Sequence, residues 1–322
     1  MSSLLNTALA AVTTNGKDGF LYYQNGQDIL EAHSESGTSW TAKASTVTSN
    51  AASGGSALTA YYVEHDADFQ NKSTIHVVYL DRSAKVADRV KVLSEGTWKD
   101  GKVDGISTDP ASVSRITGGA FNGSDWNPDG SQWVYFNTSD LPFTTLLEML
   151  LTSKRPKGNQ LQITEIRRTP KSPWNTETVL PEITLALPGT DLASSIVKGT
   201  IDLYYQDHQE NVNHWVSQDN QWHDEKVLIP ASEVENSTPL ATLNNGKKHV
   251  FYADRSSPPK IKDRIDGNTV DVAPFYPGTH LTAVSINGKV TLFYKSLNPV
   301  GAIAAKIYDG SSWKDGGIVV PA

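Results

Sequence analysis

Cysteine is absent from the 322-residue chain, so disulfides and thiolate chemistry are both excluded. Long apolar runs are absent as well, because no segment approaches the ~18 apolar residues that a membrane-spanning helix needs. An excess of positive charge is also missing. The formal net charge is −7 at pH 7, which argues against a nucleic-acid partner, because phosphate binding needs a basic surface. These absences favour partners other than membranes and nucleic acids.

Common catalytic motifs are missing too. The chain has no G-x-S-x-G elbow, no H-E-x-x-H sequence and no P-loop, which argues against the hydrolases that use them. His65 is close to Asp66 and Asp68, but no further ligand follows at a diagnostic spacing. We therefore expect a solvated loop over Glu64–Phe69, no metal ion and no cofactor.

The first residues lack the basic segment of a secretory signal, and their apolar stretch is interrupted by Asn6. The apolar residues Ala8–Val12 are interpreted as a first strand instead. We therefore expect a cytoplasmic protein in which the Asn-x-Ser/Thr sequons are not used.

One short segment occurs six times along the chain. Each copy has a variable residue, then Leu or Val, then in most copies two aromatic residues. The copies begin at Phe20, His76, Trp133, Asp202, His249 and Thr291. Successive copies start between 42 residues (291 − 249) and 69 residues (202 − 133) apart. A repeat near 40–50 residues, built from β-formers and lengthened by insertions, is typical of a β-propeller.

Each repeat is divided into four predicted strands. The first is small and apolar, as in Leu9–Val12, which suits the crowded innermost strand of a propeller. The aromatic segment is the second strand, and Ile29–Glu31 is typical of the third. The fourth begins with Trp in five copies, at Trp40, Trp98, Trp174, Trp222 and Trp313. We expect these Trp side chains to pack between blades. The prediction is an all-β, six-bladed propeller that forms one domain over residues 1–322.

The third blade is lengthened by a segment with helical features. Asp140 is a suitable N-cap, Pro142 fits the first turn, and Lys154 and Arg155 precede the terminating Pro156. We therefore predict one short helical insertion in blade 3, which packs on the propeller, covers a pocket or binds a partner.

With six repeats of four predicted strands each, the chain resembles the fungal fucose-specific lectins, which are six-bladed propellers. In that family an Arg at the head of the second strand and a Glu in the third bind the sugar, while an aromatic of the adjoining blade stacks on it. Phe20–Gln24, Ile29–Ala32 and Trp40 form the most similar blade. Because lectins of this family are often dimeric, the resemblance also implies a homodimer.

The departures from the lectin pattern concern the sugar-binding residues. The Arg position is taken by the six variable residues that begin the copies, and none of them is Arg. The Glu position holds Glu31, Asp88, Glu165, His214, Asp263 and Ala305. Without the guanidinium, a fucose site loses its charge-assisted hydrogen bonds, so no blade keeps the complete constellation.

The chain also resembles the lectin-like hetero-Diels–Alderases of fungal tropolone–sesquiterpenoid pathways. This resemblance implies a pericyclase that joins a tropolone o-quinone methide to a humulene-type alkene without a cofactor. Such a site needs apolar walls and a few polar groups that orient the substrates or move protons. The candidate catalytic residues are His76, His249, Asp202 and His214. The candidate substrate-binding residues are Phe20, Tyr22, Trp133, Tyr204, Trp215, Asp88 and Asp263.

We expect these residues to form a pocket near blades 2–4, either between blades or at the centre of the ring. The alternative is a binding module without enzymatic activity, which holds another glycan or a protein through a surviving blade such as Phe20, Glu31 and Trp40.

Overall fold

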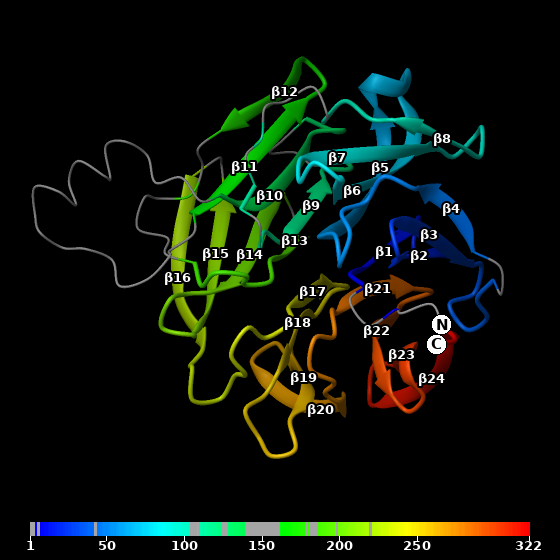
Figure 1. The fold of residues 1–322 in the computed structure, drawn as a ribbon. Helices are drawn as coiled ribbons and strands as arrows, with labels where there is room; N and C mark the ends of the chain where they lie inside the picture. Colours follow the sequence, from blue (N-terminus) through cyan, green and yellow to red (C-terminus); the bar gives the residue numbers. More distant parts are fainter. Residues whose placement is uncertain are drawn as a thin grey trace, which may run out of the picture.

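Six four-stranded antiparallel sheets surround a common axis in the computed structural model (Figure 1). The structure describes residue 4 and residues 7–41, 44–103, 108, 110–111, 113–123, 128–138, 162–177, 180, 186–197, 199–218 and 221–322. Each sheet is a blade made from four consecutive strands of the chain, and its first strand is the innermost. The predicted all-β, six-bladed propeller is confirmed.

The first three blades contain the following strands. Blade 1 has β1 (Leu9–Thr14), β2 (Asp18–Asn25), β3 (Asp28–Ser34) and β4 (Ser45–Thr48). Blade 2 has β5 (Leu58–Asp66), β6 (Lys72–Leu80), β7 (Val86–Val92) and β8 (Thr97–Asp100). Blade 3 has β9 (Ile116–Ala120), β10 (Gln132–Thr138), β11 (Gln162–Thr169) and β12 (Ser172–Glu177).

The last three blades follow the same order. Blade 4 has β13 (Ala193–Val197), β14 (Thr200–Gln206), β15 (Val212–Gln218) and β16 (Gln221–Ile229). Blade 5 has β17 (Ala241–Asn244), β18 (Lys248–Ala253), β19 (Lys260–Ile265) and β20 (Asn268–Pro274). Blade 6 has β21 (Thr282–Ile286), β22 (Lys289–Leu297), β23 (Val300–Tyr308) and β24 (Trp313–Val320).

A second six-fold repeat, Ser/Thr-x-Leu/Ile, leads into the innermost strand of every blade. Its hydroxyl accepts a hydrogen bond from the backbone N–H that follows the aromatic pair of the second strand. The six bonds measure 2.6–2.9 Å, and the hydroxyls belong to Thr7, Ser56, Ser114, Thr190, Thr238 and Thr279. These side chains are buried, so each bond satisfies a backbone donor that has no water to bind. The repeat thereby fixes the first strand against the second.

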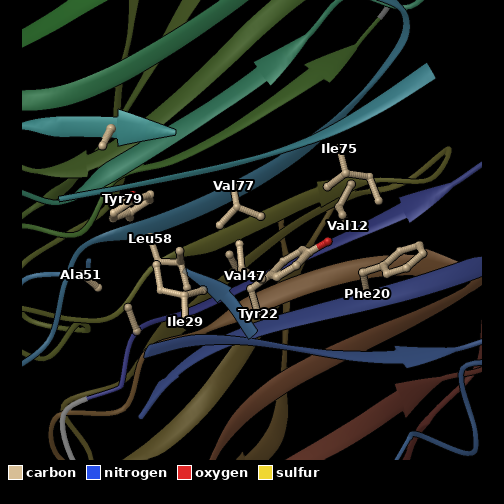
Figure 2. Packing of buried hydrophobic residues seen from close by; sticks show 13 residues of the cluster. Val12, Phe20, Tyr22, Ile29, Val47, Ala51, Leu58, Ile75, Val77 and Tyr79 are labelled. Carbon is tan, nitrogen blue, oxygen red and sulfur yellow. The ribbon is translucent and has the colours of Figure 1, made fainter. Parts of the chain in front are cut away.

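Tryptophan side chains join neighbouring blades, as the sequence predicts. Four of the five pack edge to face against the first residue of the aromatic pair in the preceding blade, with centroid distances of 5.0–6.0 Å. The pairs are Trp98 with Tyr22, Trp222 with Tyr135, Trp313 with Phe251 and Trp40 with Phe293. Figure 2 shows the core between blades 1 and 2, where Tyr22 lies among aliphatic side chains of both blades.

The ring closes between blades 6 and 1, where the two ends of the chain meet (Figure 1). No strand is exchanged between these two blades. The backbone N–H of Ala11 donates to Thr282 Oγ1 at 2.9 Å, and the backbone N–H of Asn287 donates to Gly16 at 2.7 Å. Ile286 also packs close to Gly19 and beneath Trp40. Side-chain packing and a few hydrogen bonds therefore close the ring.

The predicted helix in blade 3 and the predicted loop at 64–69 have different outcomes. The helix expected at 140–151 lies outside the described residues, which contain no α-helix. The expected solvated loop at 64–69 is wrong for Asp66, whose side chain is fully buried because it binds His76 and Arg168. No helix within the described part of the chain is long and apolar enough to cross a membrane.

Candidate functional site

A cavity of about 560 Å³ lies on the propeller axis, among the innermost strands. It exists because every inner strand carries a small residue two positions after the Leu or Ile of the second repeat. These six residues are Ala11, Ala60, Gly118, Ser194, Thr242 and Ala283. All six are partly exposed. Small side chains at one level of the ring therefore leave room for a ligand.

The floor of this cavity is a ring of aliphatic side chains, one from each blade. Leu9, Leu58, Ile116, Leu192, Leu240 and Leu281 are 3–7% exposed and leave a space of only about 40 Å³ between them. Water and small ligands are therefore restricted at this level. The axial cavity has one wide mouth, on the side where the first and second strands of each blade connect.

Aromatic residues from blades 2 and 3 form part of the wall. Tyr61 and Tyr62 follow Ala60 on β5, and Trp133 reaches the cavity from β10. Trp133 reaches it by crossing Gly119, because a Cβ atom built on that glycine would lie 2.4 Å from the indole ring. The glycine pair in β9 is therefore the reason why this tryptophan can approach the axis.

The rest of the lining is apolar or neutral. Val12, Leu243 and Val284 contribute aliphatic surface, while Asn122 and Thr242 add amide and hydroxyl groups. Apart from two tyrosines, no titratable side chain lies among the described residues that line the cavity. The cavity can therefore hold and orient apolar molecules with neutral hydrogen-bonding groups, and its lining offers no strong acid or base.

The predicted catalytic histidines lie elsewhere, in three separate blades. His76 in blade 2 is 2% exposed, and both of its ring nitrogens face carboxylates. Nε2 is 2.7 Å from Asp66 Oδ2, and Nδ1 is 3.2 Å from Asp88 Oδ2. Arg168 of blade 3 lies 3.1 Å from the other oxygen of Asp66. Tyr61 covers the imidazole with a centroid distance of 5.1 Å. This network is sealed from solvent.

The charge of His76 follows from these contacts. Burial alone would lower the pKa of His76, but hydrogen bonds and charge interactions with Asp66 and Asp88 outweigh it and raise the pKa to about 9. Burial of Asp66 raises the pKa of its carboxyl, but contacts with His76 and Thr74 lower it overall. His76 is therefore an imidazolium at neutral pH and a poor general base.

Blades 4 and 5 each bring one predicted histidine and one predicted aspartate together. In blade 4, His214 Nε2 is 2.6 Å from Asp202 Oδ1, which also lies 3.0 Å from Lys248 Nζ of blade 5. In blade 5, His249 Nδ1 is 2.8 Å from Asp263 Oδ2, and both side chains are fully buried. Burial raises the pKa of Asp263, although His249 opposes the rise. Neither pair lines the axial cavity.

The predicted aromatic residues are also distributed around the ring. Tyr204 stacks on His214 with a centroid distance of 4.6 Å, and the Trp215 indole N–H donates to Tyr205 at 2.9 Å. Phe20 and Tyr22 belong to the interface of blades 1 and 2. Of the predicted residues, Trp133 alone lines the axial cavity. The structure therefore assembles three His–Asp pairs and does not bring the whole predicted set into one pocket.

The interface of blades 1 and 2 holds a second polar site. Glu31 Oε1 lies 2.7 Å from Lys91 Nζ of blade 2, and Glu31 Oε2 accepts a hydrogen bond from the Tyr22 hydroxyl at 3.0 Å. The Lys91 ammonium lies 5.0 Å from the centre of the Phe20 ring and 5.8 Å from that of Trp98. A carboxylate, a cation and two aromatic rings therefore meet between these blades. Trp40, which the sequence assigns to this blade's site, packs on blade 6 instead.

Sequence reasoning missed the residues that build both sites. Lys91 lies on the third strand of the next blade, whereas the lectin pattern places the cation at the head of the second strand. The small residues around the axis have a signal, because all six lie two positions after the Leu or Ile of the second repeat. No sequence signal indicates that Asp66 belongs to a site, because its partner His76 lies ten residues away across a turn.

Solved structures similar to this chain are lectins. AofleA from Arthrobotrys oligospora matches with a TM-score of 0.74 and 17% identity over 99% of this chain and 87% of its own. The Aleuria aurantia lectin, described as a six-bladed β-propeller with a novel fucose recognition mode, matches with a TM-score of 0.73 and 17% identity over 100% and 99% of the two chains. A lectin from Burkholderia pseudomallei matches less well, with a TM-score of 0.58 and 14% identity over 94% and 81%.

No protein-family model matches the chain, and no curated protein matches it. At 14–17% identity, these solved structures establish how the chain folds and leave its ligand open. The chain therefore shares the six-bladed β-propeller fold of fungal fucose-binding lectins.

Proposed function

We propose that the axial cavity binds apolar small molecules and that the protein is a cofactor-independent pericyclase. In the reaction class that the sequence resemblance implies, a tropolone o-quinone methide adds to a humulene-type alkene. The observation that carries the proposal is the cavity of about 560 Å³ with its closed floor and its apolar and neutral lining. Pockets of about 300–1,000 Å³ are typical of small-molecule sites.

The lining fits a cycloaddition better than it fits proton transfer. A cycloaddition needs two apolar partners held in a near-attack geometry, and orientation contributes up to about 7–11 kcal/mol in the best cases. The Asn122 amide, which gives one N–H to the carbonyl of Tyr62 and has a second, is a neutral donor that suits the partial negative charge developing on the heterodiene oxygen. The predicted histidines, which are sealed in blades 2, 4 and 5, fit structural roles. The proposed step is therefore the addition itself, with the heterodiene formed in solution.

The test is adduct formation from a hydroxymethyl tropolone and a humulenol-type alkene, followed by chromatography. We expect purified protein, without added metal or nucleotide, to increase the rate and to favour one stereoisomer. Protein unfolded by heat is the control. A rate and an isomer ratio equal to those of the protein-free reaction would refute the catalytic proposal.

The second candidate is a glycan site between blades 1 and 2. It is favoured by one observation, the Lys91–Glu31 pair beside Phe20 and Trp98, which replaces the missing Arg with a cation from the next blade. A sugar could bind the two charged groups and stack on an aromatic ring. The related lectins bind fucose, so methyl α-L-fucoside is the probe.

Calorimetric titration with methyl α-L-fucoside decides this alternative. If it is correct, wild-type protein binds the sugar, Lys91→Met loses most of the affinity, and Lys289→Met does not. Lys289 is a suitable control because it lies exposed on blade 6. Absence of saturable binding by the wild-type protein would reject a fucoside site.

A further inference from the structure

A second cavity, of about 220 Å³, lies on the axis beneath the aliphatic ring. We call it the lower vestibule. Its position follows from the second repeat, because the residue between Ser/Thr and Leu/Ile precedes the aliphatic ring in each blade. This position holds Ala8, Ala57, Arg115, Asp191, Pro239 and His280. Four of the six line the lower vestibule, and three of those four are ionisable: Arg115, Asp191 and His280.

The charged residues of the lower vestibule are not arranged as closed pairs. Arg115 forms no ion pair within the part of the chain that the structure describes. Asp191 Oδ2 lies 3.9 Å from His280 Nδ1 and accepts a hydrogen bond from the backbone N–H of Leu240 at 3.2 Å. Behind the wall, the Lys295 ammonium donates to the carbonyl of Gly278 at 2.8 Å, and Gly278 itself lines the vestibule. Arg115 and His280 therefore share the lining with one carboxylate, and the Lys295 ammonium lies behind it.

Burial and the neighbouring positive charges both disfavour the protonated forms of His280 and Lys295. Burial lowers the pKa of His280 well below its usual range, and Arg115 and Lys295 lower it further. Burial likewise lowers the pKa of Lys295 to about 8, with Arg115 contributing. Burial raises the pKa of Asp191, although Arg115 opposes the rise. An anion bound among these groups would relieve the repulsion.

The lining also leaves space for an anion. Gly189 and Gly278 adopt positive φ angles of 75° and 77° beside the vestibule, where a side chain would be strained and would narrow the mouth. Thr279 and Ser237 complete a rim that is mostly polar. Space for several waters, at about 30 Å³ each, also accommodates a small oxyanion with part of its hydration.

We propose that the lower vestibule is a binding site for a small oxyanion, a carboxylate or a phosphate, held by Arg115. The site is separate from the axial cavity, because the aliphatic ring lies between them. It does not depend on the proposed pericyclase activity. Ligands of the two cavities enter from opposite ends of the propeller.

Calorimetric titrations with inorganic phosphate and with acetate test this site and distinguish the two anion classes. We expect saturable binding of at least one of them. Loss of a charge-assisted hydrogen bond in Arg115→Gln should weaken binding at least about tenfold. Arg264→Gln, at a partly buried arginine on β19, should leave it unchanged. Asp191→Asn should tighten it, because the substitution removes the only carboxylate among the described lining residues.

The pH dependence of anion affinity tests the site in the wild-type protein, without a variant. Lys295 loses its proton as the pH rises through about 8, so affinity should fall between pH 7 and pH 9. Lys295 acts from behind the wall, and His280, Asp191 and Arg115 are the charged or titratable groups among the described lining residues. Absence of saturable binding by the wild-type protein, or equal affinities of wild type and Arg115→Gln, would overturn the proposal.

Discussion

His76, at the position where the resemblance to lectins leads one to expect a sugar-binding arginine, is part of the protein interior. Its two ring nitrogens contact Asp66 and Asp88, and Tyr61 stacks on its face. The sequence shows a histidine near the head of a strand and does not show the two carboxylates that fold onto it. The prediction of a catalytic base was therefore reasonable from sequence, and burial is what argues against it.

Replacement of His76 tests the structural role. We expect His76→Gln to lower the free energy of unfolding at pH 6.5 by about 3–5 kcal/mol, because it leaves buried carboxylates without their cation. His65→Gln is the matched control. His65 also pairs with an aspartate, Asp129, but its side chain is 56% exposed, so a loss of at most about 1 kcal/mol is expected.

The same pair of variants has a defined pH dependence. The pKa of His76 is about 9 in the folded protein, against ~6.5 when unfolded, so its protonation stabilises the fold by on the order of 3 kcal/mol. This contribution is fully present below about pH 6.5 and is lost as the pH rises through 9. Urea unfolding at several pH values should therefore show a His76→Gln deficit that shrinks between pH 6.5 and pH 9. A deficit independent of pH would contradict the imidazolium assignment.

At the scale of the strand, much of the fold could be predicted because the repeats are local. The aromatic repeat identified the second strand of every blade, and the Trp positions identified the packing between blades. Blade 3 was harder, because its inner strand, Ile116–Ala120, contains two glycines and has weak strand propensity. Packing overrides propensity there, since the glycines make room for Trp133.

The Ser/Thr of the second repeat can be tested by removal of one hydroxyl. Thr190 is fully buried and accepts a hydrogen bond from the backbone N–H of Gln206 at 2.7 Å. Thr190→Val should therefore lower the free energy of unfolding by about 1–3 kcal/mol, because a buried donor is left unsatisfied. Urea unfolding followed by tryptophan fluorescence measures the change.

Thr13 on β1 provides the opposite case. Its hydroxyl is shielded from solvent and has no hydrogen-bond partner among the described residues. Thr13→Val should therefore be neutral or stabilising. Valine keeps the shape of threonine and removes the hydroxyl. Equal changes in the free energy of unfolding for Thr190→Val and Thr13→Val would therefore show that the hydrogen bond of Thr190 does not stabilise the fold.

At the scale of the whole molecule, closure of the ring rests on the contact between blades 6 and 1. Ile286 is 2% exposed there and packs against blade 1. Ile286→Ala should cost about 2–5 kcal/mol, and cooperative unfolding should be retained. Ile318→Ala is the control, because Ile318 is 45% exposed on β24 and its loss should cost less than about 1 kcal/mol. Similar effects of the two variants in a thermal melt would contradict this account of closure.

The position of the proposed ligand site could not be predicted from the lectin pattern. That pattern directs attention to the blade interfaces, whereas the cavity arises from six small residues that meet only after the ring has closed. Each of them, such as Ala60 or Ala283, is unremarkable in its own strand. The cavity that they line depends on an arrangement of six strands that lie far apart in the sequence.

The central claim is that the axial cavity, rather than a blade interface, is the small-molecule site. The most direct test is the affinity of a tropolone–sesquiterpene adduct for the wild type and for two variants. Ala283→Phe should fill the cavity and weaken binding at least about tenfold, whereas Glu31→Gln, between blades 1 and 2, should bind like the wild type. Unchanged affinity in Ala283→Phe, or a loss confined to Glu31→Gln, would contradict the account.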